Sequence, residues 1–201
     1  MIISFGDTWV NLWPSAILVL AIILIVLRLR KRKSIYLFVF SLFSLYILFV
    51  IDKTIFPIHI TDYDHGEFFH PNAGINLIPF YFGRSTISRI IYYQIIANIF
   101  LTIPFGFGLR FISRVRAKAF LWIPFAIGFG IELIQFIISL ALGYLYRVID
   151  INDVILNALG VIIGFGLYKI FSWVYLFLFD RLNFSTEGVT GFLNDVVKPR
   201  E

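Results

Sequence analysis

Long apolar runs constrain this chain more than any other feature. Several reach or exceed the roughly 18 residues that an α-helix needs to cross a bilayer, and they are apolar throughout rather than alternating as the strands of a membrane barrel would. Only 14% of the 201 residues are charged, against about 25% in typical soluble domains. The runs predict an all-α, polytopic helical membrane protein with five spans, at residues 12–27, 34–56, 90–112, 119–142 and 153–179.

Basic residues between the spans predict the orientation. Residues 28–33 read RLRKRK, and a second basic group follows the third span, at Arg110, Arg114, Arg116 and Lys118. Short loops rich in Lys and Arg stay in the cytoplasm. Both basic loops fall on the same side of the five-span arrangement, so the N-terminus is expected outside and the C-terminus inside. The net charge of +5 therefore indicates topology rather than binding of nucleic acid, which needs a basic soluble surface.

The chain divides into four parts by composition. These are two N-terminal spans with their basic loop (1–57), an extracytoplasmic loop (58–89), a core of three spans (76–179) and a cytoplasmic tail (180–201). In the tail, residues 192–198 have the pattern of a short surface helix. No internal repeat is apparent, which argues against transporters built from inverted repeats. The first apolar run lacks the flanks of a cleavable signal and is expected to remain as a helix.

Several chemistries are excluded or disfavoured. The chain has no cysteine, so disulfides, thiol catalysis and thiolate metal sites are ruled out. His59, His65 and His70 lie among acidic residues but match no compact ligand spacing, so a solvated loop is expected rather than a metal site. No Gly-x-Ser-x-Gly elbow marks a serine nucleophile. No metal or cofactor is expected.

Polar side chains inside the spans are the main functional signal, because ionisable groups in lipid are rare and usually functional. Glu132 lies about ten residues before the outer end of its span, roughly 15 Å deep at 1.5 Å per residue. Gln135 follows on the same face, and Asn98 and Asn157 are expected roughly 12 Å and 6 Å deep in the third and fifth spans. These groups are thus expected to meet in the outer half of the membrane.

The segment after the fourth span continues this pattern. Residues 143–152 are expected as an outside loop that carries Arg147 and Asp150. Asp150, Asp153, Asn157, Gly160 and Gly164 fall on one helical stripe if the fifth helix begins near Asp150. Glycines four residues apart permit close approach of another helix.

A structural interpretation remains open for these residues. Amides such as Asn98 and Gln135 often serve only to bond one helix to another. Glu132 requires a cation, several donors or a proton if it is buried. Arg147 is the nearest evident cation, and Asp150 and Asp153 compete for it.

The ordered motifs from Asn76 to about Ile170 resemble the VanZ-like family of bacterial membrane proteins. They are NLIPF at 76–80, Asn98, IPFGFGL at 103–109, IEL-x-Q at 131–135 and R-x-x-D-x-x-D-x-x-x-N at 147–157. The first two spans and the histidine-bearing loop lie outside the resemblance. It implies functional positions at Asn76, Pro79, Phe80, Asn98, Pro104, Gly106, Glu132, Gln135, Arg147, Asp150, Asp153 and Asn157. It also implies an envelope role, with a link to teicoplanin resistance in Gram-positive bacteria, but no agreed reaction.

Three functions compete. The first is an outward-facing site in the bacterial cytoplasmic membrane for an envelope lipid or lipid-linked wall component. Its expected catalytic residues are Glu132, Arg147 and Asp150, and its expected substrate-binding residues are Asn76, Asn98, Gln135, Asp153 and Asn157. The second is a non-enzymatic binder of a lipid headgroup or of the glycopeptide antibiotic. The third, a transporter, is disfavoured by the missing repeats. The residues alone do not separate catalyst from binder, and they do not fix an oligomeric state.

Overall fold

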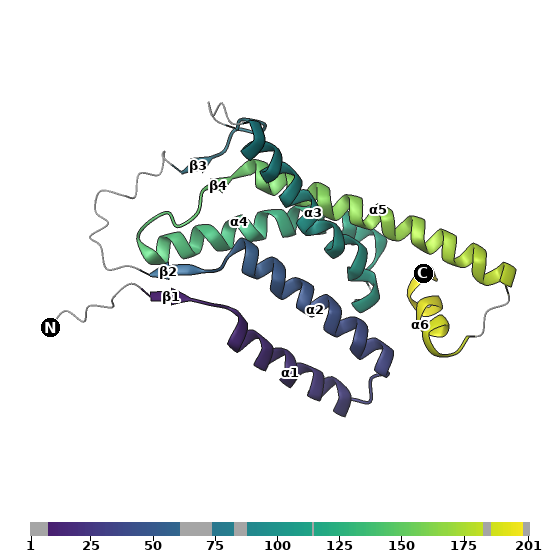
Figure 1. Cartoon of the computed structure of the whole chain (residues 1–201). Coiled ribbons are helices and arrows are strands. Elements are labelled where there is room, and N and C mark those ends of the chain that lie inside the picture. The colour runs from purple at the N-terminus through teal and green to yellow at the C-terminus, as the bar shows by residue number, and fades with distance from the viewer. Residues whose placement is uncertain (1–7, 61–73, 83–87, 114, 183–185, 199–201) are drawn as a thin grey trace.

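The computed structural model describes residues 8–60, 74–82, 88–113, 115–182 and 186–198 (Figure 1). Helices dominate these ranges. They are α1 (Trp13–Leu29), α2 (Ser34–Thr54), α3 (Ser88–Ile112), the 3₁₀-helix η2 (Ala117–Leu121), α4 (Ile123–Leu142), α5 (Ile151–Leu182) and α6 (Gly188–Val197). The strands are β1 (Thr8–Val10), β2 (Ile58–Ile60), β3 (Ile75–Asn76) and β4 (Ile149–Asp150).

Four helices, α2 to α5, are long and apolar enough to cross a membrane within the described ranges, and α1 is a shorter apolar helix of 17 residues. The predicted helical architecture is thus confirmed, with shifted boundaries. The fourth helix begins at Ile123 rather than near 119, because residues 117–121 form the 3₁₀-helix and Pro124 occupies the first turn, where proline is tolerated. The short strands were not predicted, since two or three residues carry no detectable periodicity.

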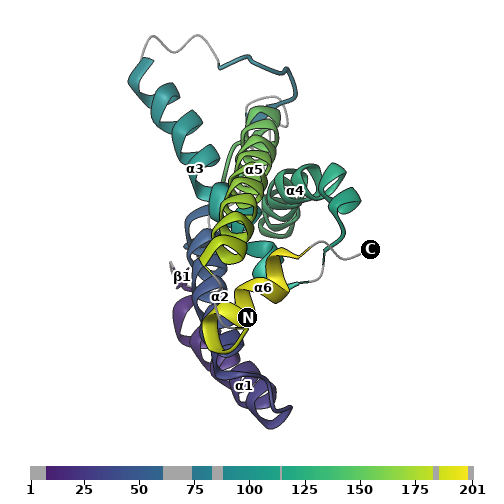
Figure 2. The ribbon, with the colours of Figure 1, turned by 90° about the vertical axis from the view of Figure 1, so that its right-hand side faces the viewer.

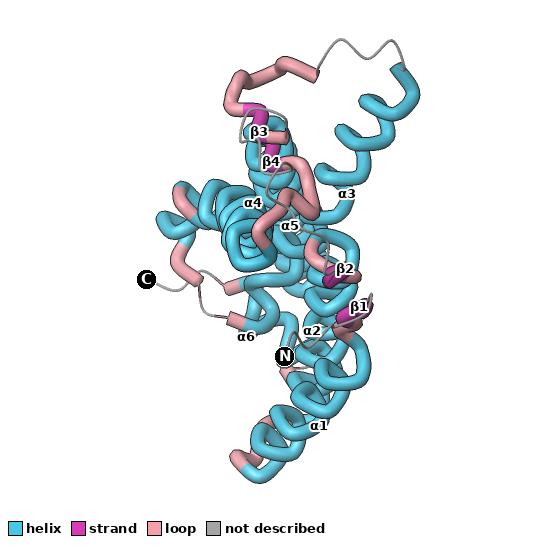
Figure 3. The backbone as a smooth tube through the Cα atoms, turned by 90° about the vertical axis from the view of Figure 1, so that its left-hand side faces the viewer, coloured by secondary structure: helices cyan, strands magenta, loops and turns pink. Residues whose placement is uncertain are grey.

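α1 and α2 form an antiparallel hairpin whose open end is closed by strands. β1 pairs with β2 in antiparallel register, with Trp9 opposite His59. The Trp9 and His59 rings stack with centroids 4.3 Å apart. The start of α1 and the end of α2 therefore lie at the same end of the molecule (Figure 3). Asp62, Asp64, His65, Glu67 and His70, which belong to the predicted polar loop, lie outside the described residues.

α5 is the centre of the fold, and it packs closely on α3 and α4 (Figure 1). Glycines make this possible. A methyl group at Gly160 or Gly164 would overlap the backbone carbonyls of Ile99 or Ile103 in α3, and one at Gly128 in α4 would overlap a carbonyl of α5. The small-residue contacts expected from the sequence are therefore present, and they let polar groups on three helices approach one another.

The connection from α4 to α5 is shorter than the expected loop of residues 143–152, because α5 begins at Ile151. α4 ends at Leu142, and Gly143, the residue that follows, takes the left-handed conformation (φ 77°). The chain then returns alongside α4, so that Asp150 bonds to Glu132, about ten residues and roughly 15 Å before the end of that helix. α5 thus begins beside the middle of α4 rather than beside its C-terminal end (Figure 1).

The tail folds back on α5 as the helix α6, which confirms a short helix there (Figure 2). The hydroxyls of Tyr168 and Ser172 donate to the carbonyls of Val196 and Val197 at 3.0 and 3.2 Å. These are among the last carbonyls of α6, which have no partner inside the helix. The two bonds thus fix the end of α6 against α5.

Candidate functional site

The centre of the candidate site is Asp150, where two short strands meet. β3 and β4 are parallel, and Asn76 lies opposite Asp150. The Asn76 side-chain amide donates to Asp150 Oδ1 at 2.9 Å, and the backbone N–H of Asn152 donates to the same oxygen at 2.8 Å. Asp150 is buried, with 8% of its surface exposed. The fold therefore brings together two predicted site residues that lie 74 positions apart in the chain.

Asn152 organises the segment 74–82, and the sequence did not single it out as a site residue. Its Oδ1 accepts the N–H of Phe80 at 2.6 Å, and its Nδ2 donates to the carbonyl of Tyr81 at 2.8 Å. Phe80 has φ 62°, a conformation that is unfavourable for a bulky side chain. Asn76 also donates to the Tyr81 carbonyl at 2.8 Å. Two asparagines thus replace the backbone partners that this apolar segment lacks.

Glu132 contacts the site through the backbone of Asp150. Its Oε2 accepts the Asp150 N–H at 3.0 Å, and only 5% of the residue is exposed. Asp153, Asp150 and Arg147 are near enough to act on it electrostatically. The expected ion pair with Arg147 does not form, since the single ion pair among the described residues joins two neighbours in α2. A peptide N–H, rather than a guanidinium, is the direct partner of Glu132.

Asp153 is held by α3. The side-chain amides of Gln94 and Asn98 donate to its Oδ1 at 3.0 and 2.5 Å. One turn further along both helices, the Thr102 hydroxyl donates to the carbonyl of Asn157 at 2.8 Å. The face of α3 that carries Gln94, Asn98 and Thr102 therefore meets the stripe predicted on α5. Asn98 donates directly to a carboxylate of the candidate site. This bond fits both a structural role, joining α3 to α5, and a functional role, orienting Asp153.

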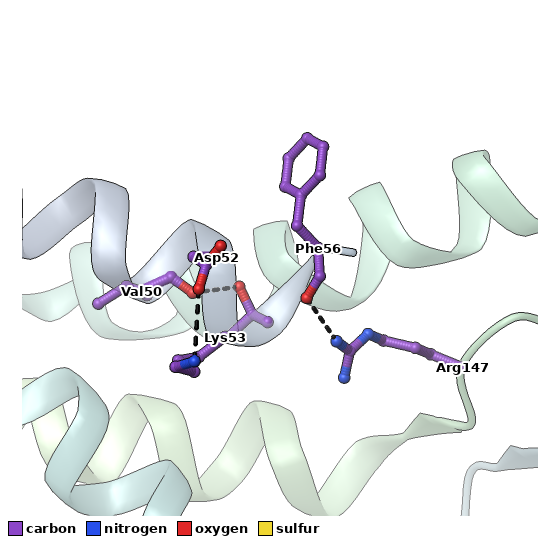
Figure 4. A network of polar contacts seen from close by, with 6 residues as sticks. Val50, Asp52, Lys53, Phe56 and Arg147 are labelled. Carbon is purple, nitrogen blue, oxygen red and sulfur yellow. Dashed lines mark hydrogen bonds and ion pairs between the residues drawn. The ribbon is translucent and has the colours of Figure 1, made fainter. Parts of the chain in front are cut away.

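Gln135 and Arg147 are directed to a different place, the end of α2. Gln135 Nε2 donates to the carbonyl of Thr54 at 2.8 Å, and an Arg147 guanidinium nitrogen donates to the carbonyl of Phe56 at 3.2 Å. Figure 4 shows Arg147 reaching Phe56, near the ion pair of Asp52 and Lys53 (3.3 Å). Both side chains thus bond to carbonyls at or just beyond the C-terminus of α2, where carbonyls lack helical partners.

These residues fall within one family match. The family model described as VanZ/LLP1 matches residues 43–172. The chain belongs to the VanZ-like family. The match begins in α2 and continues through residues 58–75, so the sequence-based interpretation was wrong to leave the second span and the histidine-bearing loop outside the family region. A search of curated proteins and a search of solved structures both find no match.

The VanZ-like core holds three carboxylates near one another, each with an oxygen to spare. Within the described residues, Glu132 Oε1, Asp150 Oδ2 and Asp153 Oδ2 accept no hydrogen bond. None of the three is among the buried side-chain atoms that lack a partner, so each reaches accessible surface. Electrostatic interactions join the three groups. The arrangement can accept a proton, or bind donors of a ligand, at up to three positions.

Tyr146 adds a hydroxyl that the sequence did not point to. It lies in the connection between α4 and β4. Burial raises the pKa of the Tyr146 phenol, the neighbouring Arg147 guanidinium partly offsets the rise, and Glu132 adds to it. The phenol therefore stays protonated at neutral pH and can donate a hydrogen bond. Its position beside both Arg147 and Glu132 links the two parts of the candidate site.

The histidines do not join this site in the described part of the chain. His59 stacks on Trp9 in the β1–β2 pair, and the other two lie outside the described ranges. Among the described residues, no group of three His, Cys, Asp or Glu side chains is arranged to hold a metal ion. Asn157 differs from the other amides of the candidate site, because its Oδ1 is buried without a partner.

Proposed function

We propose that this VanZ-like protein works in the bacterial cytoplasmic membrane on an envelope lipid or a lipid-linked wall component, through a site that faces outward. The observation that carries the proposal is the meeting of Glu132, Asp150 and Asp153 at the buried start of α5, each with one unbonded oxygen. Carboxylates within membrane-spanning segments are energetically costly and are usually functional where they occur. Membership of the family and four apolar helices support a multi-pass membrane location.

The proposed topology has five spans, with the N-terminus outside and the C-terminus inside. The pairing of β1 with β2 supports the fifth span, because it ties the start of α1 to the end of α2. A helix of 17 residues covers roughly 26 Å, which is close to the roughly 30 Å of the hydrocarbon core. The two helices of the hairpin are therefore proposed to cross together.

Cysteine labelling tests this topology without background, because the chain has no cysteine. We expect Trp9→Cys, on exposed β1, to react with a membrane-impermeant maleimide in intact cells. Lys118→Cys, in η2, should react only after permeabilisation. The reverse pattern would place the carboxylates toward the cytoplasm and would contradict the outward-facing proposal.

In the proposed reaction, Glu132 or Asp150 acts as the general acid or base. Arg147 binds a phosphate or carboxylate of the substrate, for which its planar fork is suited. Asn76 and Asn98 hold the carboxylates in place, while Gln135 fixes α4 to the end of α2. Asn157 is 1% exposed and its unbonded oxygen is buried, so its proposed role is to support the site from α5 rather than to contact the substrate directly.

Mass spectrometry of envelope lipids and wall precursors tests the proposed reaction. Three strains are compared: one without the protein, one with the native form and one with Glu132→Gln at matched expression. We expect a lipid or precursor species to change only with the native form, and Glu132→Gln to remove about 99% of that change, since general acid–base groups contribute about 10²–10⁴ in rate. Glu187→Gln, an exposed carboxylate in the tail, serves as the control and should behave as native.

Binding without chemistry is the second candidate, because Arg147 and the carboxylates do not pair and so offer both charges to a ligand. It predicts unchanged envelope chemistry, a teicoplanin difference between the strains, and saturable retention of teicoplanin or lipid by the purified protein. A lipid profile that changes with the native form alone would reject it. If Glu132→Gln changed the lipid profile as fully as the native protein does, the catalytic proposal would be rejected.

A further inference from the structure

A cationic cavity of about 960 Å³ lies at the end of the molecule away from the carboxylates. It is enclosed by the turn between α1 and α2, the C-terminal end of α3 with the following segment, and α6. Figures 1 and 2 show α6 on the same side as that turn. Among the described residues, six basic ones line it: Lys31, Arg32, Lys33, Arg110, Arg116 and Lys198.

Positive charge in this cavity far exceeds the negative charge beside it. Asp195 is the one acidic residue among the described residues that line it, against the six cations. Lys31 also has φ 57°, a left-handed conformation in which glycine or asparagine is the usual residue. The lysine at this turn position extends the run of positive charge into the cavity.

The walls of the cavity are fixed before any ligand arrives. α6 is bonded to α5 through Tyr168, Ser172 and Tyr175, whose hydroxyls donate to carbonyls of α6 at 3.0, 3.2 and 2.7 Å. Arg110 donates to the carbonyl of Val115, and its guanidinium lies 5.6 Å from the Tyr168 ring centroid. A preformed site loses less conformational entropy on binding.

The cavity is also amphipathic. Phe111, Ile112 and Phe192 line it beside the cations, and the adjoining last turn of α1 presents Leu29, 77% exposed, toward the surroundings. Basic pockets between transmembrane helices at the cytoplasmic end are typical sites for anionic lipid headgroups. A free cytosolic anion would make no favourable contact with the apolar border, whereas the acyl chains of a lipid would pack against it.

We infer that this cavity binds the phosphodiester headgroup of an anionic phospholipid from the leaflet on that side of the membrane. The inference is independent of the proposed function, since it involves neither the carboxylates nor Arg147. Lys33 and Arg116 are the variants of choice, because both are exposed and neither side chain forms a hydrogen bond within the described residues. Their loss should leave the fold intact.

Native mass spectrometry of the purified full chain in detergent tests the inference, with phosphatidylglycerol and phosphatidylcholine of matched acyl chains as titrants. We expect at least a tenfold preference for phosphatidylglycerol. Lys33→Gln/Arg116→Gln should weaken its binding about 25-fold, since each basic residue near an anionic lipid surface contributes roughly a factor of five. Lys33→Arg/Arg116→Lys, which keeps the charge, should bind as native.

The matched control is Lys169→Gln/Arg181→Gln, which removes two exposed cations of α5 that do not line the cavity. It should bind phosphatidylglycerol as the native chain does. Equal weakening in both charge-removing variants would overturn the inference, because it would show general attraction to the basic end. Equal binding of the two lipids would overturn it as well. Binding of sn-glycerol 3-phosphate as tight as that of phosphatidylglycerol would assign the cavity to a soluble phosphate ester instead.

Discussion

Replacing Gly160 with leucine should separate α3 from α5 and destabilise the whole core. A Cβ at this position would overlap the carbonyl oxygen of Ile99 and the hydroxyl of Thr102. The obstacle is largely backbone, so no side-chain rotamer can relieve it. Overpacking typically costs about 1–3 kcal/mol where side chains can adjust, and we expect about 3 kcal/mol or more here. Thermal unfolding of the purified protein, followed by tryptophan fluorescence, should show a melting temperature lowered by about 10 °C.

Gly166→Leu is the matched control on the same helix. A Cβ added at Gly166 would have no other atom within 4 Å, and the residue is exposed. The melting temperature should stay the same or rise slightly, because leucine favours helix more than glycine does. If Gly160→Leu melted together with Gly166→Leu, the close approach of α3 and α5 would not contribute to stability as we argue. The contact would then not explain how Asn98 reaches Asp153.

Much of the helical frame could be predicted from the sequence because its signals are local. Apolar runs predicted the bounds of α2 to α5 within a few residues. Gly160 and Gly164 predicted which face of α5 another helix approaches closely. Helical spacing also predicted that polar groups of the three core spans lie near one another, but it did not single out the bond from Asn98 to Asp153. Each of these inferences needs only 3.6-residue periodicity and a rough membrane depth.

The part of the site that could not be predicted depends on contacts between segments far apart in the sequence. Nothing local indicates that residues 143–150 return along α4, or that β3 pairs with β4. Arg147 was expected near Glu132 because a buried carboxylate commonly takes a cation. It bonds to Phe56 instead, because the returning chain already supplies the Asp150 N–H to Glu132. A peptide group can satisfy a carboxylate, and such partners cannot be read from residue types.

The same argument explains why asparagines gather here. Non-helical backbone at membrane depth must have its N–H and C=O groups bonded within the protein. In the proposed arrangement, residues 74–82 and 143–150 are such backbone, because they meet beside Glu132 in the middle of α4, and the two-residue strands cover only part of it. Within residues 74–82, the side chains of Asn76 and Asn152 bond the Tyr81 carbonyl, and Asn152 also accepts the Phe80 N–H. Family resemblance marked Asn76, whereas Asn152 is recognisable only from its contacts.

Asn152→Ala should therefore loosen the backbone of segment 74–82, although Asn152 is not among the residues proposed to contact the substrate. Asn152 is 2% exposed. Its loss leaves the Phe80 N–H without a partner and removes one of the two side-chain bonds to the Tyr81 carbonyl. Each unsatisfied buried group costs about 1–3 kcal/mol, and the φ of 62° at Phe80 opposes the folded arrangement by roughly 1–2 kcal/mol. We expect hydrogen exchange of backbone amides in this segment to accelerate about 100-fold, for a loss of about 3 kcal/mol, as measured by mass spectrometry of the purified protein.

Two further variants distinguish this specific effect from a general loss of stability. Asn194→Ala removes a similarly buried asparagine, 5% exposed, from α6, and exchange in 74–82 should stay as in the native chain. Phe80→Gly in the Asn152→Ala background should slow exchange again by about fivefold, because glycine takes a positive φ without the steric penalty of a side chain. Unchanged exchange in Asn152→Ala would mean that Asn76 and the strand pair hold the segment alone. Catalysis or binding at Asp150 would then be independent of Asn152, and the two asparagines would have separate roles.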